Sequence, residues 1–226
     1  MADQPRNPET VPAEESSDSR PRPCDPASTE RDVWLRACER LAEACRYERE
    51  HTQQVVRLAM LLFDELQPLH NRGADDRLLL ECAAVLHDIG WLQGRKGHHK
   101  AALRIILEAT DLPMDERRRQ MIAQVARYHR KALPAARHEG YAVLSDEDRR
   151  RIGELAALLR LADGLDRTHA DVVEGLTCRV EPQQVTVHCR VRGDASQEVL
   201  ATGRKSDLFE AVFARKLVVD TAPSMG

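Results

Sequence analysis

The chain has 226 residues, of which 42% are hydrophobic and 31% charged, and its formal net charge at pH 7 is -3. This near balance excludes an overall electrostatic field that would draw the protein onto nucleic acid or an anionic membrane. No apolar run approaches the ~20 residues of a membrane span, and the N-terminus lacks a secretory pattern, so we expect a cytoplasmic protein.

Residues 1–28 are rich in Pro, Ser, Glu and Asp with few large apolar side chains, which predicts a disordered tail. From Thr29 onward, apolar residues recur at helical spacing between breaks that contain Pro, Gly or Asp. We therefore predict one helical domain over residues 29–172. Its helices are expected at about 29–45, 49–69, 75–90, 98–110, 115–132 and 146–168.

After Gly175 the period changes from helical to alternating, which predicts strands at 176–180 and 185–191. A third strand at 197–201, a short helix at 206–214 and a last strand at 216–219 would complete a small α+β appendage. We assign residues 173–220 to this appendage and 221–226 to a flexible C-terminus. The predicted fold class is mainly α, a helical bundle with a small C-terminal α+β appendage.

Five polar side chains fall on the apolar stripes of their helices instead of on the solvent-facing sides; they are His51, His87, His99, His129 and Asp163. A lone inward histidine is more often a hydrogen-bonded core residue, and Arg160 or Arg167 could pair with Asp163. Five inward polar residues on five different helices would each need a separate explanation of this kind, whereas one common site accounts for all of them. A buried carboxylate is costly without a compensating cation, so the pattern predicts one shared metal centre.

Two neighbouring histidines compete for one place in this centre. Both His98 and His99 can face inward, and alignment with Leu103 and Ile106 favours His99. The six cysteines form no CxxC pair, which argues against a thiolate zinc site or a disulfide framework.

The order His51, His87-Asp88, His129, Asp163 resembles the HD superfamily of metal-dependent phosphohydrolases. The segments LLLECAAVLHDIGW, GHHKAALRIILEATDLP and LLRLADGLDR are similar to the C-terminal HD domain of the exopolyphosphatase/guanosine pentaphosphate phosphatase (Ppx/GppA) family. The likeness extends over about residues 30–220 and implies an HD-type helical bundle. The glycine-rich phosphate loops of the actin-like domains that hydrolyse polyphosphate in that family have no counterpart in this sequence, so that activity is not carried over.

The resemblance implies one or two divalent ions, with Mn, Fe, Zn or Co as the expected metals and Mg as a further option. A first ion would take His51, His87, Asp88 and Asp163, and a second would take His99 and His129 with Asp88 as the bridge. Asp88, Lys100 and Asp166 are the expected catalytic residues, although Asp166 could instead orient a ligand, cap a helix or pair with a neighbouring arginine. The expected substrate-binding cations are Lys100, Arg130, Lys131 and Arg167.

The expected reaction is hydrolysis of a phosphoester or phosphoanhydride in a nucleotide or related small phosphorylated molecule. Two alternatives stay open at this stage. One is a regulatory or nucleotide-sensing module without catalysis, and the other is di-iron oxygenase chemistry like that of myo-inositol oxygenase. The appendage could also mediate homodimerisation.

Overall fold

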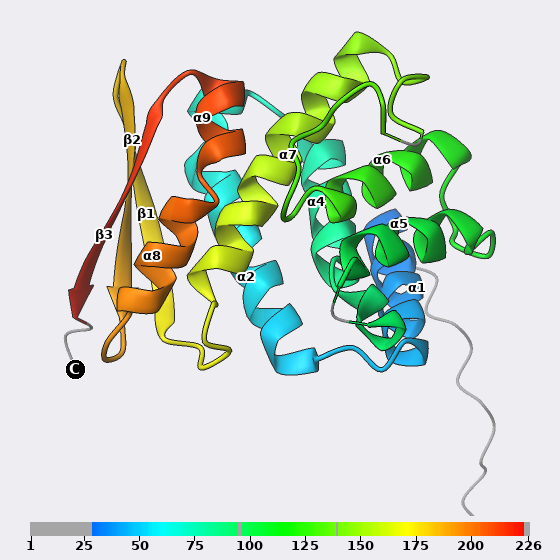
Figure 1. Ribbon diagram of the computed structural model, residues 1–226, viewed down its shortest axis with the longest axis horizontal. Helices are drawn as coiled ribbons and strands as arrows, with labels where there is room; N and C mark the ends of the chain where they lie inside the picture. Colours follow the sequence, from blue (N-terminus) through cyan, green and yellow to red (C-terminus); the bar gives the residue numbers. More distant parts are fainter. Residues whose placement is uncertain (1–28, 95, 139, 224–226) are drawn as a thin grey trace, which may run out of the picture.

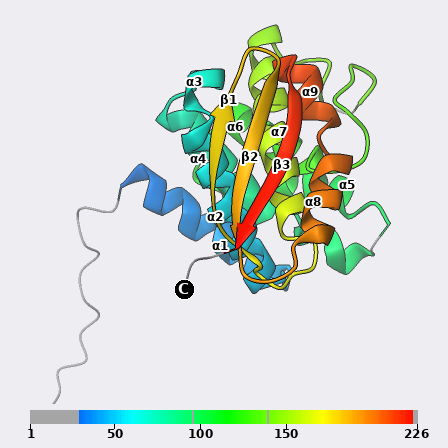
Figure 2. The same cartoon turned by 90° about the vertical axis from the view of Figure 1, so that its left-hand side faces the viewer.

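The computed structural model describes residues 29–94, 96–138 and 140–223. Helices pack about one apolar core, and a three-stranded sheet lies along one side of them (Figures 1 and 2). The elements, in chain order, are α1 (Glu30–Ala44), α2 (Arg49–Glu65), α3 (Gln67–His70), α4 (Ala74–Leu86), the 3-10 helix η1 (Ile89–Gln93), α5 (His98–Glu108), α6 (Glu116–Arg127), α7 (Asp146–Leu165), β1 (Val173–Val180), β2 (Gln184–Val191), α8 (Ser196–Arg204), α9 (Asp207–Phe213) and β3 (Lys216–Pro223).

Three helices begin at residues whose side chains accept hydrogen bonds from the first turn. Thr29 caps α1 in a reciprocal capping box with Asp32, while Asp115 and Ser145 accept from backbone N–H groups of α6 and α7. These caps satisfy donors that have no partner within the helix. The predicted starts of these helices are confirmed to within a residue or two.

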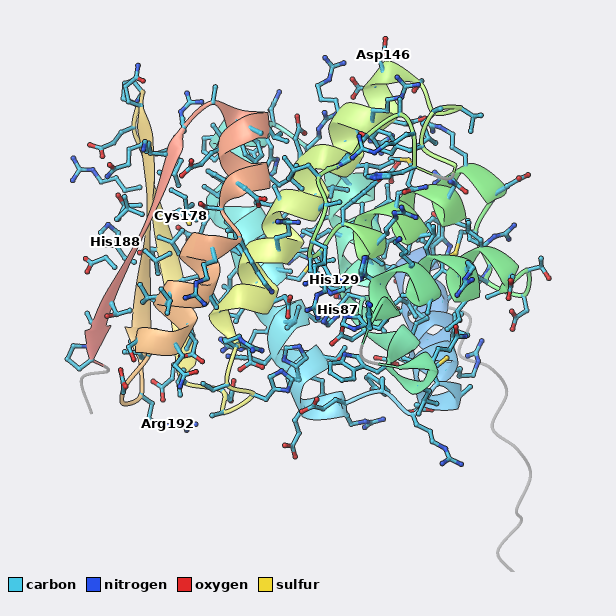
Figure 3. All side chains as sticks on the ribbon, in the orientation of Figure 1. His87, His129, Asp146, Cys178, His188 and Arg192 are labelled. Carbon is cyan, nitrogen blue, oxygen red and sulfur yellow. The ribbon has the colours of Figure 1, made fainter. Side chains whose placement is uncertain are left out.

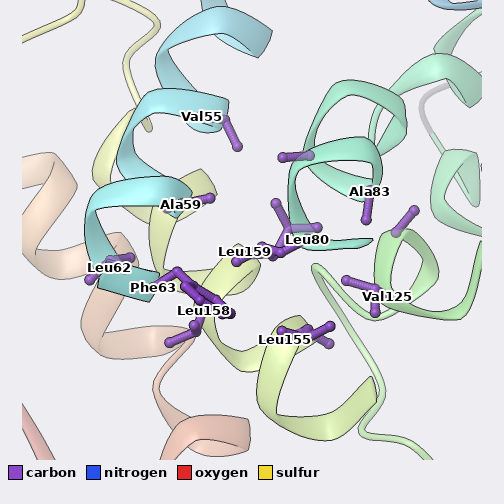
Figure 4. Packing of buried hydrophobic residues seen from close by; sticks show 14 of the residues in the cluster. Val55, Ala59, Leu62, Phe63, Leu80, Ala83, Val125, Leu155, Leu158 and Leu159 are labelled. Atoms are coloured by element: carbon purple, nitrogen blue, oxygen red, sulfur yellow. The ribbon is translucent and has the colours of Figure 1, made fainter. Parts of the chain in front are cut away.

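The core lies where α2, α4, α6 and α7 meet (Figure 4). Leu62 from α2, Leu80 from α4, Val125 from α6 and Leu159 from α7 are all fully buried. Burial of a leucine or valine side chain stabilises the fold by about 1.5–3 kcal/mol relative to exposure. The helices that pack this core also carry the inward polar residues, so close packing holds the candidate site in place.

The sheet has the order β1-β2-β3, with β1 antiparallel and β3 parallel to β2. The chain passes from β2 to β3 through α8 and α9, both of which pack against α7, while α2 packs against β1. Gly164 of α7 permits the close approach of α8, because a Cβ there would lie 2.8 Å from Oγ1 of Thr202. The sheet therefore packs against the helical body through β1, and α8 and α9 pack against it through α7.

The prediction of a strand at 197–201 is wrong, because these residues lie within α8. The buried positions in this stretch are Ala195, Glu198 and Thr202, which have helical spacing. Two of the three are polar, so no apolar period marks the helix in the sequence. Glu198 is tied down by Thr168, whose N–H and hydroxyl both donate to its carboxylate, at 2.9 and 2.6 Å.

Residues 221–223 belong to β3 and not to a flexible C-terminus as predicted. The predicted disordered tail, residues 1–28, and the last three residues lie outside the described part of the chain. The proposed division at residue 172 stays a prediction. Within the described ranges, no helix is long and apolar enough to cross a membrane.

Candidate metal centre

A first cluster of inward ligand atoms brings together three helices. His51 comes from the first turn of α2, His87 from the C-terminal end of α4 and Asp163 from the last turns of α7. One ligand atom from each lies within 4.8 Å of the others, and Nε2 of His51 is 3.6 Å from Oδ1 of Asp163. Both histidines are buried, while Asp163 is partly exposed to solvent.

A second cluster adjoins the first through the His87-Asp88 pair. Oδ1 of Asp88 lies 3.2 Å from Nε2 of His98 and 3.4 Å from Nε2 of His129. Oδ2 of the same carboxylate is 3.7 Å from Nε2 of His87 and accepts a 2.8 Å hydrogen bond from the indole of Trp91. Asp88 therefore stands between the two clusters. Figure 3 shows His87 and His129 together in the middle of the helical body.

Three of the histidines are oriented by hydrogen bonds on the ring nitrogen that points away from the clusters. Nδ1 of His87 lies 2.8 Å from the carbonyl of Ala84, and Nδ1 of His129 lies 2.6 Å from that of Ala126. Nδ1 of His51 lies 2.8 Å from Oδ2 of Asp166. A carbonyl or carboxylate there accepts the Nδ1 proton, which leaves Nε2 as the coordinating atom.

Within the described part of the chain, three buried atoms of this centre have no hydrogen-bond partner, namely Nε2 of His51, Nε2 of His87 and Oδ1 of Asp88. A buried polar atom left unpaired costs about 1–3 kcal/mol, and here three such atoms belong to the two adjoining clusters. Divalent cations at the two clusters would satisfy all three, the nitrogens of His51 and His87 at the first and Oδ1 of Asp88 at the second. Imidazole and carboxylate donors without thiolates suit Mn, Fe, Zn or Co, so the residues present fit the metal that the sequence predicts.

The environment sets the protonation of these groups. Burial disfavours the charged form of His51, but the adjacent carboxylates of Asp163 and Asp166 raise its pKa to about 9. Burial lowers the pKa of His87 below its usual value and that of His129 to about 3. Burial would raise the pKa of Asp163, yet the neighbouring Lys205 ammonium holds it well below its usual range. The centre thus combines a protonated imidazole at His51 with neutral imidazoles at His87 and His129 and an ionised carboxylate at Asp163.

The structure places His98, and not the favoured His99, beside Asp88. His98 is 1% exposed, whereas His99 is half-buried and belongs to neither cluster. His98 is the first residue of α5, and its ring stacks on Trp91 with centroids 5.0 Å apart. A Cβ at Gly90 would overlap the His98 carbonyl, so glycine lets η1 lie directly against this turn. A helical projection does not separate the two histidines reliably, because α5 begins at His98 and the residues before it are not helical.

A basic cavity of about 480 Å³ opens over the centre, with Asp88 and Asp163 in its lining. Three of the predicted substrate-binding cations line it, Arg130, Lys131 and Arg167, together with Arg204 and Lys205 from the end of α8. Lys100 is exposed and does not line this cavity.

The two cations from α8 were missed by sequence reasoning. Lys205 pairs with Oδ2 of Asp163, a contact across 42 residues that no local pattern indicates. The only available signal was the adjacent Arg204-Lys205 pair. Arg160, a competing partner for Asp163 in the sequence, instead pairs with Asp207 at 2.5 Å and donates to the carbonyls of Tyr128 and Lys131.

Fold and site together define a mainly helical protein with a buried histidine and carboxylate centre beneath a basic cavity. Residues 33–201 match the family model for Ppx/GppA phosphatase, domain III, which spans more than half of the chain. The chain therefore belongs to the Ppx/GppA phosphatase family. Arg204 and Lys205 lie just beyond the matched residues.

Proposed function

We propose that the protein is a metal-dependent phosphohydrolase of the HD superfamily, cleaving a phosphoester or phosphoanhydride in a nucleotide or similar small phosphorylated molecule. One observation carries this proposal: two adjoining clusters of His and Asp ligand atoms, three of them unpaired, lie beneath a cavity lined by five cations. Membership of a phosphatase family supports the same reaction class.

His51, His87 and Asp163 would hold one ion, and Asp88, His98 and His129 a second, with Asp88 placed between them. Such ions supply Lewis acidity and lower the pKa of water towards neutrality when bound. Asp88 is held for this role by the Trp91 indole on Oδ2. Asp166 fixes the ring of His51, so we assign it a positioning role in place of the predicted catalytic one.

The cations around the cavity would bind and orient the phosphoryl group. Arginine guanidinium groups match phosphate oxygens in pairs, and lysine adds a point charge. Arg130 also lies 3.1 Å from Nε2 of His98, which brings its guanidinium to the edge of the second cluster. Five cations against two carboxylates favour an anionic substrate and disfavour the oxygenase alternative, whose substrate is an uncharged polyol.

The decisive experiment measures metal content and phosphate release in the same preparations. Protein supplemented with Mn, Fe, Zn or Co should retain metal and release phosphate from a panel of phosphorylated small molecules. His87→Ala and Asp88→Ala should lose both properties. Arg204→Met should raise KM about tenfold or more by removing a charged contact, while Lys100→Met, a matched cation outside the cavity, should not.

A regulatory module that senses a phosphorylated ligand is the second candidate, because the same basic cavity could bind an anion without hydrolysing it. Metal retention and ligand binding without phosphate release would favour that candidate. Absence of metal under all four supplements would refute both the metal centre and the hydrolase.

A further inference from the structure

A second cavity, of about 520 Å³, lies against His51. It lies between α2 and the turn that follows α7, and Glu50, Gln53, Gln54 and Asp171 contribute to its wall. His51 and Asp166 also line it, which places it directly against the metal centre.

The two cavities have opposite charge. Among the described residues, the lining of the second carries the carboxylates of Glu50, Asp166 and Asp171 and the guanidinium of Arg57. Arg57 is engaged by the wall itself, since it donates to Oε1 of Gln54 at 2.8 Å and to the carbonyl of Val173 at 2.5 Å, and it lies 3.8 Å from Oδ1 of Asp171. An anionic group would therefore meet net negative charge here, whereas it meets net positive charge in the basic cavity.

The groups facing this space suit hydroxyls. Glu50 and Asp171 present exposed carboxylates that accept hydrogen bonds, and Gln53 presents an exposed amide that both donates and accepts. Asp166 is already bonded to Nδ1 of His51 and accepts from the N–H of Asp171 at 3.2 Å. The wall offers polar contacts, and its guanidinium, Arg57, is already bonded to Gln54 and to the carbonyl of Val173.

His169 joins the two cavities, because it lines both. Its ring stacks on that of His51 with centroids 3.8 Å apart and planes 4° from parallel, and its Nδ1 lies 2.8 Å from Glu48. The residue has φ 55°, a left-handed conformation that is uncommon outside glycine and occurs preferentially at functional sites. A molecule reaching from one cavity to the other would pass over this imidazole.

We infer that the second cavity binds the unphosphorylated part of the substrate, an uncharged hydroxylated group, while the phosphate lies in the basic cavity. The inference rests on the proposed function for its reaction but adds a separate claim about specificity. A compound with a second anion at the end remote from its phosphate should be disfavoured. Inorganic polyphosphate, which is anionic throughout, belongs to that disfavoured class.

The test compares sorbitol 6-phosphate with 6-phosphogluconate, two open-chain molecules that differ only in carrying a hydroxymethyl or a carboxylate group at the remote end. Their binding to the Mn-loaded protein is measured by calorimetry, and phosphate release is followed in parallel. We expect sorbitol 6-phosphate to bind about tenfold more tightly, as one unfavourable charge interaction close to the surface implies.

The double variant Glu50→Gln/Asp171→Asn should reduce this preference to about threefold or less, chiefly by improving binding of 6-phosphogluconate. Asn tolerates the left-handed conformation of Asp171, which has φ 53°, so the backbone is preserved. Glu108→Gln, an exposed carboxylate at the far end of α5, is the matched control and should leave the preference unchanged.

Equal affinities of the two compounds, failure of both to bind, or a preference that the double variant does not alter would overturn the inference. Discrimination in binding, without phosphate release from these compounds or from the wider panel, would support the cavity assignment and favour the regulatory candidate over the hydrolase. Phosphate release without discrimination between the two compounds would support the hydrolase and refute the cavity assignment.

Discussion

Oδ2 of Asp166 lies 2.8 Å from Nδ1 of His51, across 115 residues of sequence, and both side chains are buried. This carboxylate holds the imidazole so that Nε2 faces Asp163 and the first cluster. A carboxylate that accepts the Nδ1 proton of a metal-binding histidine fixes the orientation of the ring and raises its basicity. Loss of such a partner typically weakens metal binding.

Asp166→Ala should weaken metal binding about 10–100-fold, because the His51 ring loses the group that orients it. Asp166→Asn should retain much of the affinity, since its amide oxygen can still accept the Nδ1 proton. Titration of each purified variant with Mn²⁺ or Co²⁺ checks this. Equal affinities for wild type and Asp166→Ala would show that the contact does not position the ligand.

Metal binding should depend on pH through His51. The adjacent carboxylates of Asp163 and Asp166 raise its pKa to about 9, so below that pH Nε2 carries a proton that a cation must displace. Affinity should therefore rise with pH, by up to about tenfold per unit between about pH 6 and pH 8. His87 and His129, whose pKa values are lowered by burial, should add little over this range.

Calorimetry in two buffers of different protonation enthalpy counts the released protons directly. About one proton from His51 per ion is the expected contribution at neutral pH. A pH-independent affinity, with no proton release, would contradict the assignment of His51 as a ligand.

The adjacent histidines of α5 should differ sharply when they are replaced. His98→Ala should abolish binding of the second ion, because it removes the ring 3.2 Å from Oδ1 of Asp88. His99→Ala should leave metal stoichiometry unchanged, since His99 lies in neither cluster. Metal analysis of the two variants decides the point, and loss of the second ion only in His99→Ala would reverse the assignment.

Gly90→Ala should lower the free energy of unfolding by about 1–3 kcal/mol, because an added Cβ overlaps the backbone of His98 and overpacks the η1–α5 contact. It should also weaken binding of the second ion by displacing His98. Gly203→Ala is the matched control, since a Cβ there meets no heavy atom within 4 Å.

At Gly203, within α8, alanine should leave stability unchanged or raise it slightly. Urea denaturation of both variants measures the difference. Equal stabilities would mean that η1 can move away from α5 without cost.

Much of the helical body was predictable from the sequence, because apolar spacing and N-terminal caps are local signals. The starts of α1, α6 and α7 follow from Thr29, Asp115 and Ser145. In α8, by contrast, the buried residues include Glu198 and Thr202, whose burial depends on contacts with Thr168 and Gly164. A hydrophobicity pattern cannot show such a helix.

The sequence by itself determined that His51, His87, His129 and Asp163 face the interior, because a helix's period sets the direction of each side chain. Only the tertiary structure decided which of His98 and His99 reaches Asp88, that Asp166 holds His51, and that Arg204 and Lys205 join the basic cavity. These relationships join elements far apart in the chain, and distance across the fold depends on how helices pack, which no single helix encodes.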